Sequence, residues 1–339
     1  MTINNATVYP RPDLPLLVVE DMPDLAGGFI AHEVLPILPV AISTAPVPKS
    51  LRGATANIHR TKRPKYGAYP TIQNVISSDA IYNCDDNGIE IPRDAKDIEI
   101  HGGQDKADLL FGAQALRSAL LVQEYAAASL LFTTATFDSG YNAAAAAVWD
   151  HATDGKPLND IANAKAAIQK ACGMKANTVV MGYGSYVAMC KCPQVQTAIR
   201  NILGINTRGD AAIEIPLSTL SMILNVARIL IGEATYNTAN EGQTAVMANV
   251  WADNCLVCYT DTSSAGLMPG LGRTFVWENG LSGLSAADVQ AMPAPLRHVM
   301  LELVGTTDNY EKMRARTYQD QLVLNKGAGY LITNTEAEA

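Results

Sequence analysis

The sequence predicts an α+β fold, because helical and strand-like segments follow one another without a regular βαβ alternation. Apolar residues recur at helical spacing over 104–137, with no proline in between, and again over 150–173. Short runs of β-branched and aromatic residues, bounded by glycine or proline, are interleaved with these helices and also close the chain. We therefore expect helices in the central part and strands at the end.

The composition is that of a large globular chain with few charges. The 339 residues are enough for one large or two medium domains, and 48% of them are hydrophobic. Only 17% are charged, against about 25% in typical soluble domains. Two explanations fit: a large buried interior, or a surface covered by partner subunits, since contact surfaces lose charge to avoid desolvating ions. The net charge of −8 gives no indication of nucleic-acid binding.

Neither a targeting segment nor a membrane span is expected. The first eight residues are polar, and no stretch approaches the ~20 apolar residues of a span. The six cysteines are too sparse for a disulfide framework and indicate reduced thiols in a cytoplasm. Cys255 and Cys258 have CxxC spacing but lie in a predicted strand, where residues three apart point to opposite faces. We therefore expect buried structural cysteines and no metal.

The first 50 residues are interrupted by eight prolines, so we expect an extended or looped arm with a short helix near 25–35. Such an arm has little means of burying itself. The sequence therefore predicts that it lies along a neighbouring subunit.

Charge is distributed unevenly after the arm. No acid occurs over 34–78, whereas nine acids occur over 79–108. The basic segment looks like a hairpin or long loop, and two interpretations remain open: two solvated loops of opposite sign, or a basic loop that docks on an acidic surface of another copy. The candidate contact residues are Arg52, Arg60, Lys62, Arg63 and Lys65 on the basic loop, and Asp79, Asp85, Asp86, Glu90 and Asp94 on the acidic surface.

The helix over 104–137 is the clearest element. Some 30 residues at 1.5 Å each span about 45 Å, which suits a strut across an extended subunit. Pro157 is expected to begin the second helix and Gly173 to follow its last turn. The remaining predicted elements are strands over 178–182, 227–234, 254–260, 273–278, 297–304, 312–324 and 330–333, and helices over 183–190, 194–202 and 217–225.

No catalytic constellation is recognisable in the sequence, so we predict neither enzymatic activity nor a cofactor. The glycines at 182–185 follow a strand, but no third glycine completes GxGxxG, so a plain strand-to-helix turn is favoured. The run Asp85-Asp86-Asn87-Gly88 resembles part of a calcium loop but lacks the glutamate at the twelfth position, which favours a plain turn.

Several short motifs occur in an order that resembles tailed-bacteriophage major capsid proteins of the Hong Kong 97-like fold. Each motif is modest alone, but the ordered series is specific. The motifs are spread over the segment from Trp149 to Ile332, which is more than half of the chain. They are Trp149-Asp-His, Pro157-Leu-Asn-Asp-Ile161, Ala164-Lys-Ala-Ala-Ile168, Asn177-Thr-Val-Val-Met-Gly182, Ile229-Leu-Ile-Gly-Glu-Ala-Thr-Tyr-Asn237, Val250-Trp-Ala-Asp-Asn254, Gly272-Arg-Thr-Phe-Val-Trp277 and Lys326-Gly-Ala-Gly-Tyr-Leu-Ile332.

The resemblance implies five regions. They are an N-terminal arm (1–50), an extended loop (51–78), a peripheral domain with a long spine helix (79–174), an axial domain (175–290) and a return to the peripheral domain (291–339). It also implies a virion protein, assembled in the host bacterial cytoplasm, whose copies form pentamers and hexamers of an icosahedral head around double-stranded DNA. The implied partners are the chain itself, portal, scaffolding and decoration proteins, and DNA contacted non-specifically at the inner face; no membrane is implied.

Two alternatives remain open at this stage. An encapsulin, a cellular cargo compartment, has the same fold. An unrelated α/β enzyme would use Gly182–Ser185 as a nucleotide loop.

The chain also departs from some relatives. No long helical segment precedes residue 50 as a fused scaffolding region, which favours a separate scaffolding protein or earlier proteolysis. Some relatives cross-link a loop lysine to a neighbouring asparagine. Lys62 and Lys65 are the candidates here, but the positioned carboxylate which that reaction needs is not evident in the sequence, and cross-linking is not expected.

Overall fold

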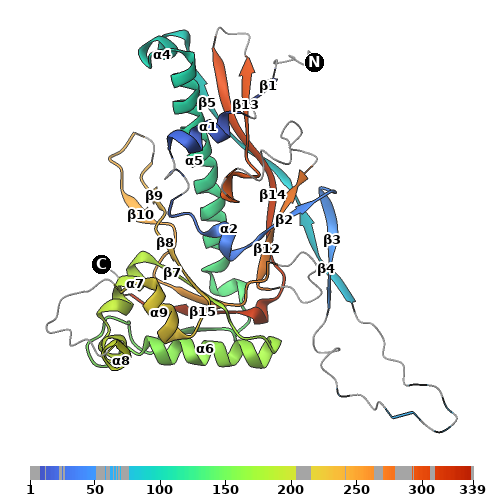
Figure 1. Cartoon of the computed structure of the whole chain (residues 1–339), viewed down its shortest axis with the longest axis vertical. Coiled ribbons are helices and arrows are strands. Elements are labelled where there is room, and N and C mark those ends of the chain that lie inside the picture. Colours follow the sequence, from blue (N-terminus) through green and yellow to red (C-terminus); the bar gives the residue numbers. More distant parts are fainter. Residues whose placement is uncertain are drawn as a thin grey trace.

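The computed structural model describes residues 8–11, 13–22, 25, 27–50, 58, 62–63, 65, 67, 69, 76–203, 215–240, 242–262, 270–278, 292, 294–305 and 310–336. Two β-sheets organise these residues, and the long helix α5 (Gln104–Leu131) runs beside the first sheet (Figure 1). Helix α6 (Pro157–Cys172) lies along the second sheet. The predicted α+β class is confirmed.

The first sheet is built around β14, the longest strand. Along one edge β14 pairs successively with β13 and β12, and along the other edge it pairs with β5. β1 extends the sheet beyond β13, and β2 extends it beyond β12. The strands are β1 (Val8–Pro10), β2 (Ile37–Val40), β5 (Asp85–Arg93), β12 (Gly272–Trp277), β13 (Met300–Gly305) and β14 (Glu311–Val323).

The second sheet has the order β6-β15-β11-β7-β8. Its central strands β7 and β11 are buried along their whole length, as expected of strands covered on both faces. The strands are β6 (Asn142–Ala144), β7 (Thr178–Gly182), β8 (Arg228–Gly232), β11 (Cys255–Cys258) and β15 (Gly329–Thr333).

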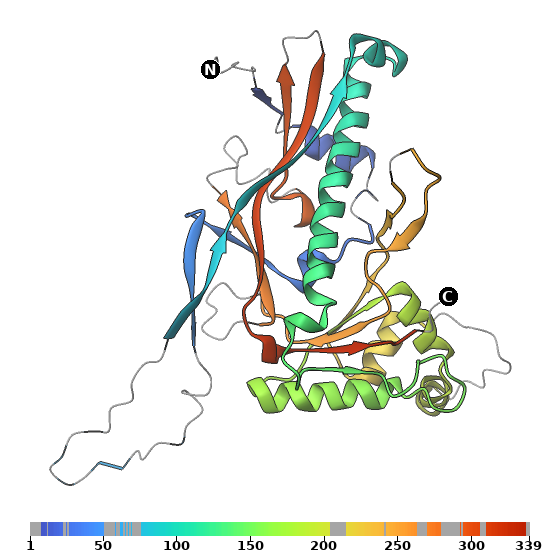
Figure 2. The ribbon, with the colours of Figure 1, turned by 180° about the vertical axis from the view of Figure 1, so that it is seen from behind.

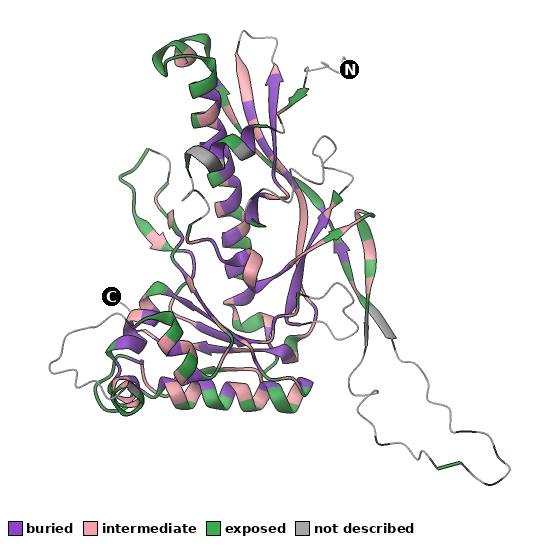
Figure 3. Ribbon diagram, in the orientation of Figure 1, coloured by how far each residue is buried: buried purple, intermediate pink, exposed green. Residues whose placement is uncertain are grey.

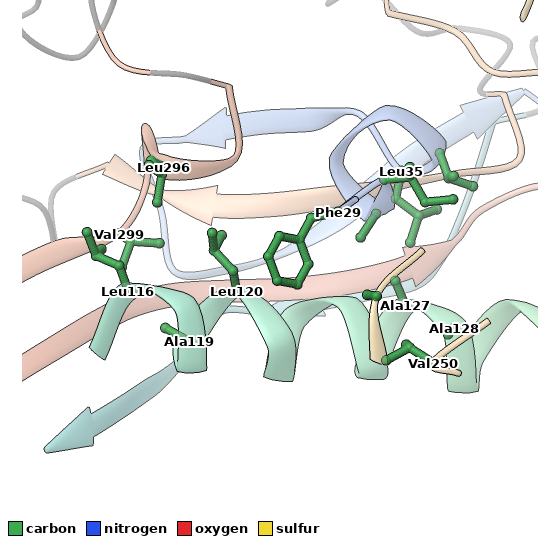
Figure 4. Packing of buried hydrophobic residues seen from close by; sticks show 14 of the residues in the cluster. Phe29, Leu35, Leu116, Ala119, Leu120, Ala127, Ala128, Val250, Leu296 and Val299 are labelled. Carbon is green, nitrogen blue, oxygen red and sulfur yellow. The ribbon is translucent and has the colours of Figure 1, made fainter. Parts of the chain in front are cut away.

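Helix α5 buries one face against the first sheet and the N-terminal segment. Figure 4 shows Leu116 and Leu120 of this face beside Phe29, Leu296 and Val299. The helix is shorter than predicted: it ends at Leu131, and a 3-10 turn, η2 (Thr134–Thr136), follows. The threonines in this segment explain the difference, since β-branched residues weaken a helix and the Thr136 hydroxyl donates instead to the Leu130 carbonyl, at 2.6 Å.

The helices of the second half follow their local sequence signals closely. α6 begins at Pro157 and ends before Gly173, whose φ of +66° is the left-handed conformation that glycine favours after a last turn. The other helices are α7 (Tyr183–Lys191), α8 (Pro193–Leu203) and α9 (Leu217–Leu224). Their predicted ranges are confirmed to within one or two residues.

The N-terminal arm corrects an expectation. The described elements of this segment pack within their own chain: β1 pairs with β13, β2 pairs with β12, and α1 (Leu14–Asp21) packs on α5. The predicted short helix near 25–35 is α2 (Ala31–Val34), whereas α1 was missed. Pro15 is compatible with α1 because it occupies the first turn, where its missing N–H costs no helical hydrogen bond. Leu14 and Val34 are buried in the main core.

The predicted domain boundaries do not follow the two sheets. β12 was placed in the axial domain but pairs with β14 of the first sheet. β15 was placed in the returning peripheral segment but pairs with β11 of the second sheet. α6 was placed before the boundary at 174 yet packs on β11 and β15. The chain therefore crosses between the sheets more often than a linear division implies, because strand pairing joins segments far apart in sequence.

Two hairpins extend from the sheets. β3 (Thr44–Ser50) pairs with β4 (Ile76–Asn83), and β9 (Thr235–Asn237) pairs with β10 (Met247–Asn249). Figures 2 and 3 show β3 and β4 leaving the body of the molecule together, with much of their length exposed or half-buried. No helix in the described part of the chain has both the length and the apolar content needed to cross a bilayer.

The strands show what the CxxC pair and the run Asp85–Gly88 do in the fold. Cys255 packs in the core on the α6 side of β11, and Cys258 packs in the core shared with α5, so the prediction of opposite faces is confirmed. None of the six cysteines forms a disulfide, and all are buried. Asp85-Asp86-Asn87-Gly88 is neither a calcium loop nor a turn: these residues pair with 316–319 of β14 as the first part of β5.

Candidate inter-subunit surface

The hairpin strands β3 and β4 are anchored where they meet the first sheet. The Tyr82 ring stacks on Phe275 of β12, with centroids 4.6 Å apart and the planes at 8°. Cys84 is buried in the same cluster, and burial raises the pKa of its thiol to about 11. The backbone N–H of Asn83 donates to Asp320 of β14, at 2.8 Å. The base of the hairpin is therefore part of the folded body.

The predicted basic loop lies between these two strands. Lys62, Arg63 and Lys65 are exposed, whereas Arg52 and Arg60 lie outside the described residues. The Arg63 guanidinium lies 5.3 Å from the centroid of the Tyr69 ring, and its Nε donates to the Gly67 carbonyl, at 2.7 Å. The predicted hairpin or loop over 58–69 falls largely outside the described residues.

Two of the predicted acidic contact residues are paired inside the chain. Asp86 on β5 accepts two hydrogen bonds from the guanidinium of Arg316 on β14, at 2.8 and 2.9 Å. Glu90, four residues along β5, binds Lys312 and Arg314 on the same neighbouring strand, at 2.8 and 2.5 Å. Hydrogen bonds from Lys312 and Arg314 lower the pKa of Glu90. These cross-strand pairs fix the register of β5 against β14.

The other three acids have different surroundings. Asp85 accepts from the Asn83 amide, at 2.7 Å. Asp94 caps α4 (Ala95–Ile100) in a reciprocal capping box with Asp97. Asp79 is exposed on β4 and takes part in an interaction of its own. Asp86 and Glu90 thus share one face of β5, which begins at Asp85, whereas Asp79 lies on β4 and Asp94 lies at the start of α4.

A buried charge network joins the N-terminal segment to α5, and sequence analysis did not identify it. Arg93 at the end of β5 forms an ion pair with Asp108 of α5, and both side chains are almost wholly buried. Asp108 also binds Arg11, at 2.8 Å, and Arg93 binds Glu311, at 2.7 Å. The only available signal was Asp108 at a core position of the predicted helix, which identifies a buried acid but not its partners.

A second buried acid links three parts of the fold. Glu124 of α5 accepts from the backbone N–H groups of Ile30 and Ala31, at 2.8 and 2.9 Å, and from Nε1 of Trp251, at 2.6 Å. Burial raises the pKa of this carboxyl, and its three donors partly offset that effect. A sequence signal did exist: Glu124 is the single acid between Leu109 and Phe137, at helical spacing from the buried Leu116, Leu120 and Leu131.

The chain's own C-terminal segment covers the glycine turn considered as a nucleotide loop. β7 ends at Gly182 and α7 begins at Tyr183, which confirms a strand-to-helix turn. The Ser185 hydroxyl hydrogen-bonds that of Thr335, at 2.7 Å, and a β-carbon on Gly184 would collide with the Glu336 carboxylate. The helix terminus that would receive a phosphate therefore faces a carboxylate, and the geometry does not support nucleotide binding there. Among the described residues, no three His, Cys, Asp or Glu side chains are placed to hold a metal ion.

Comparisons with solved structures identify the architecture. A phage-related protein from Bordetella bronchiseptica superposes with a TM-score of 0.66 at 18% identity, covering 98% of this chain and 100% of that one. A protein described as a prophage capsid protein from Escherichia coli CFT073 gives 0.51 at 8% identity over 97% and 99% of the chains. A virus-like particle from Pyrococcus furiosus gives 0.50 at 11% identity over 94% and 96%. No protein-family model matches the chain, and no curated protein matches it.

The chain has the Hong Kong 97-like fold of phage capsid proteins. This confirms the fold that the sequence motifs implied. Within the capsid fold, α5 is the predicted spine helix. The segment predicted as the extended loop, 51–78, lies between β3, which was placed in the arm, and the start of β4. The likeness extends over nearly the whole chain, including the N-terminal segment that packs on α5.

Proposed function

We propose that this chain is the major shell subunit of a tailed-phage head. Its copies form pentamers and hexamers, which close into an icosahedral shell around double-stranded DNA. Assembly takes place in the cytoplasm of the bacterial host with portal and scaffolding proteins, and decoration proteins bind the outer surface. The mature location is the virion, and the role is structural rather than catalytic.

The observation that carries this proposal is the full-length likeness to a phage-related protein at a TM-score of 0.66. A partial match would be compatible with a shared subdomain, but here each chain is covered almost completely. Closed symmetry lets many modest contacts add up to a stable particle, so a shell subunit does not need one large interface.

Two features of the chain support the proposal. The β3–β4 hairpin leaves the body of the subunit, and its anchored base gives the basic segment a fixed origin from which to reach a neighbour (Figure 2). Exposed apolar side chains lie on the outer face of the spine helix, where Val122 is 56% and Tyr125 is 48% exposed in the isolated subunit. A neighbouring copy would cover such a face in a shell.

Negative-stain electron microscopy of the purified full-length protein, together with size-exclusion chromatography, tests the proposal. Closed particles of uniform diameter, eluting near the void volume, are the expected result. A monodisperse monomer or small oligomer under all assembly conditions, including co-expression with the scaffolding and portal proteins, would contradict it.

A cellular cargo compartment is the second candidate, because the chain also superposes on a virus-like particle from an archaeon. The contents of particles isolated from the natural host distinguish the two. A phage head contains duplex DNA that resists added nuclease, whereas a compartment contains a folded protein cargo. Finding protein cargo and no protected DNA would replace the phage assignment with the compartment.

A further inference from the structure

The helical layer of the second sheet carries a group of lysines for which no ion pair is found among the described residues, and Asp160, the acid of α6, accepts from the Trp149 indole instead, at 3.1 Å. The sequence contains no Asp or Glu over 161–209, while six Lys or Arg residues occur there. Three of these lysines, Lys165, Lys170 and Lys175, lie on or just after α6. Lys326 is exposed on η5 (Lys326–Ala328), which packs against the same helix. This arrangement contrasts with β5 and β14, where cations are paired with acids across the strands.

A pocket of about 290 Å³ opens beside these lysines, between α6 and the end of α9. Its lining side chains are hydrogen-bond donors or small apolar groups, and none carries a negative charge: Lys165, Ala166, Gln169, Lys175, Ala176 and Asn225. A pocket lined by two ammonium groups and two amides suits a group with several acceptor oxygens and a negative charge.

Lys165 is held in place rather than free to swing. Its ammonium donates to the carbonyls of Leu224 and Asn225 at the end of α9, at 2.7 and 3.1 Å. Two of its three N–H donors are used in this way, which leaves one for a ligand. Burial and the nearby charge of Lys175 both lower the pKa of Lys165. The two lysines are therefore close enough to repel, and an anion between them would relieve that repulsion.

We propose that this basic face of α6, with the pocket at Lys165 and Lys175, binds backbone phosphates of the packaged duplex DNA and so faces the interior of the shell. The inference rests on the proposed function, because the chain encounters a polynucleotide only if the shell encloses one. Contact through a few lysines gives weak binding without base readout, which suits a surface that must release its genome.

The chemistry of α6 favours DNA over an anionic membrane surface. Proteins that bind membranes through a helix combine basic residues with large apolar side chains that enter the lipid. None of the large hydrophobic side chains exposed in the described part of the chain lies on α6. Its exposed positions are instead occupied by small or polar residues such as Asn163, Ala166 and Gln169.

Titration of a short fluorescein-labelled DNA duplex with full-length subunits dissociated from the particle, in which the interior face is open to solvent, followed by anisotropy at several salt concentrations, tests the proposal. Each phosphate contact adds about −0.9 to the slope of log K against log salt, so three contacts predict a slope of about −3. The double variant Lys170→Glu/Lys175→Glu should weaken binding by at least about tenfold and remove about two of those contacts. Lys165 is left unchanged because it also caps α9.

The matched control is Lys96→Glu/Lys106→Glu, which makes the same charge change on exposed lysines at the far end of the subunit (Figure 1). Equal losses in the two double variants would overturn the proposal, since net charge alone would then explain them. Absence of salt-dependent DNA binding by the unmodified protein would also overturn it, as would equal binding to vesicles of anionic lipid.

A second measurement does not depend on variants. Acetylation of lysines in the same dissociated subunits, with and without duplex DNA and read by mass spectrometry, should show protection of Lys170, Lys175 and Lys326 but not of Lys96. Protection elsewhere would assign DNA contact to another surface. Particle formation in the microscope is scored separately, so a chain that assembles but shows no protection refutes this inference and leaves the shell function standing.

Discussion

The indole N–H of Trp251 donates a 2.6 Å hydrogen bond to Oε1 of Glu124, joining the spine helix to the segment that leads into β11. The same carboxylate accepts from the backbone of Ile30 and Ala31. One side chain thus connects the N-terminal segment, the helix beside the first sheet and the segment that leads into the central strand β11 of the second sheet. Trp251 and Glu124 are both almost wholly buried, so water is not available to replace either partner.

Replacing Glu124 by alanine should therefore destabilise the whole subunit. The change leaves two backbone N–H groups and an indole N–H buried without acceptors, each costing about 1–3 kcal/mol, so a loss of at least about 3 kcal/mol is expected. Equilibrium unfolding in urea measures it. Glu99→Ala, at an exposed acid of α4, is the control and should change stability by less than about 0.5 kcal/mol. A similar small effect at both positions would contradict the role assigned to Glu124.

Gly232→Ala should disturb the same junction from the other side. Gly232 ends β8, and a β-carbon there would collide with the ring of Trp251, which is fully buried. Overpacking of this kind costs about 1–3 kcal/mol or more, because neither the ring nor the strand has room to move. Thermal unfolding provides the measurement. Gly140→Ala, whose new β-carbon would meet no atom within 4 Å, should leave the melting temperature nearly unchanged.

The sequence predicted the central elements well because their signals are local. Pro157 and Gly173 determine where α6 begins and ends, and the buried runs of β7 and β11 exclude water on both faces. The described part of 8–40 was misjudged because its proline content suggested an unburied arm. Burial of Leu14, Phe29 and Val34 against α5 depends on contacts about 80–110 residues apart, which no local pattern records.

Stability should fall on mild acidification because of His298. Burial, with a smaller contribution from Arg297, lowers the pKa of this imidazole from 6.5 to about 4. A depressed histidine pKa contributes stability that is fully present above pH 6.5 and is lost as the pH falls towards 4. The difference between 6.5 and about 4 corresponds to roughly 3 kcal/mol.

The unfolding free energy measured between pH 7 and pH 4 checks this prediction. In His298→Gln the contribution of His298 to this pH dependence should disappear, so the unfolding free energy should change less between pH 7 and pH 4. His101→Gln, at an exposed histidine on the solvent side of Phe111, should retain the slope. An unchanged slope in His298→Gln would show that other groups cause the acid sensitivity.

The buried pair Arg93–Asp108 should be sensitive to loss of either partner. Asp108→Ala removes the acid that both Arg93 and Arg11 contact, and breaking a buried pair in this way costs about 3–5 kcal/mol. Arg11→Ala should cost less, because its side chain is 29% exposed and Arg93 still neutralises Asp108. Urea unfolding of both variants gives the order. A larger loss for Arg11→Ala would contradict the assignment of Arg93 as the principal partner.

The candidate contact surface was harder to predict than the fold. The sequence identified a basic segment followed by an acidic one, but the acids of β5 face cations of β14, more than 200 residues away. Pairing of Asp86 with Arg316 and of Glu90 with Arg314 follows from strand register, which composition does not contain. Charge excess along a sequence therefore overstates the charge that remains available to another subunit.

The basic loop gives the most direct test of assembly. Reversing two of its charges in Arg60→Glu/Lys62→Glu should block or misdirect particle formation, because a loop of the wrong sign is repelled by an acidic neighbour. The subunit itself should stay folded, since the hairpin is anchored at Tyr82 and Phe275, remote from these positions along the chain. Circular dichroism and thermal unfolding check the fold, and size-exclusion chromatography with negative-stain microscopy checks the particles.

Lys170→Glu/Lys175→Glu makes an equal charge change on α6 and should still assemble. Normal particles from the loop variant would exclude charge-guided docking of this segment.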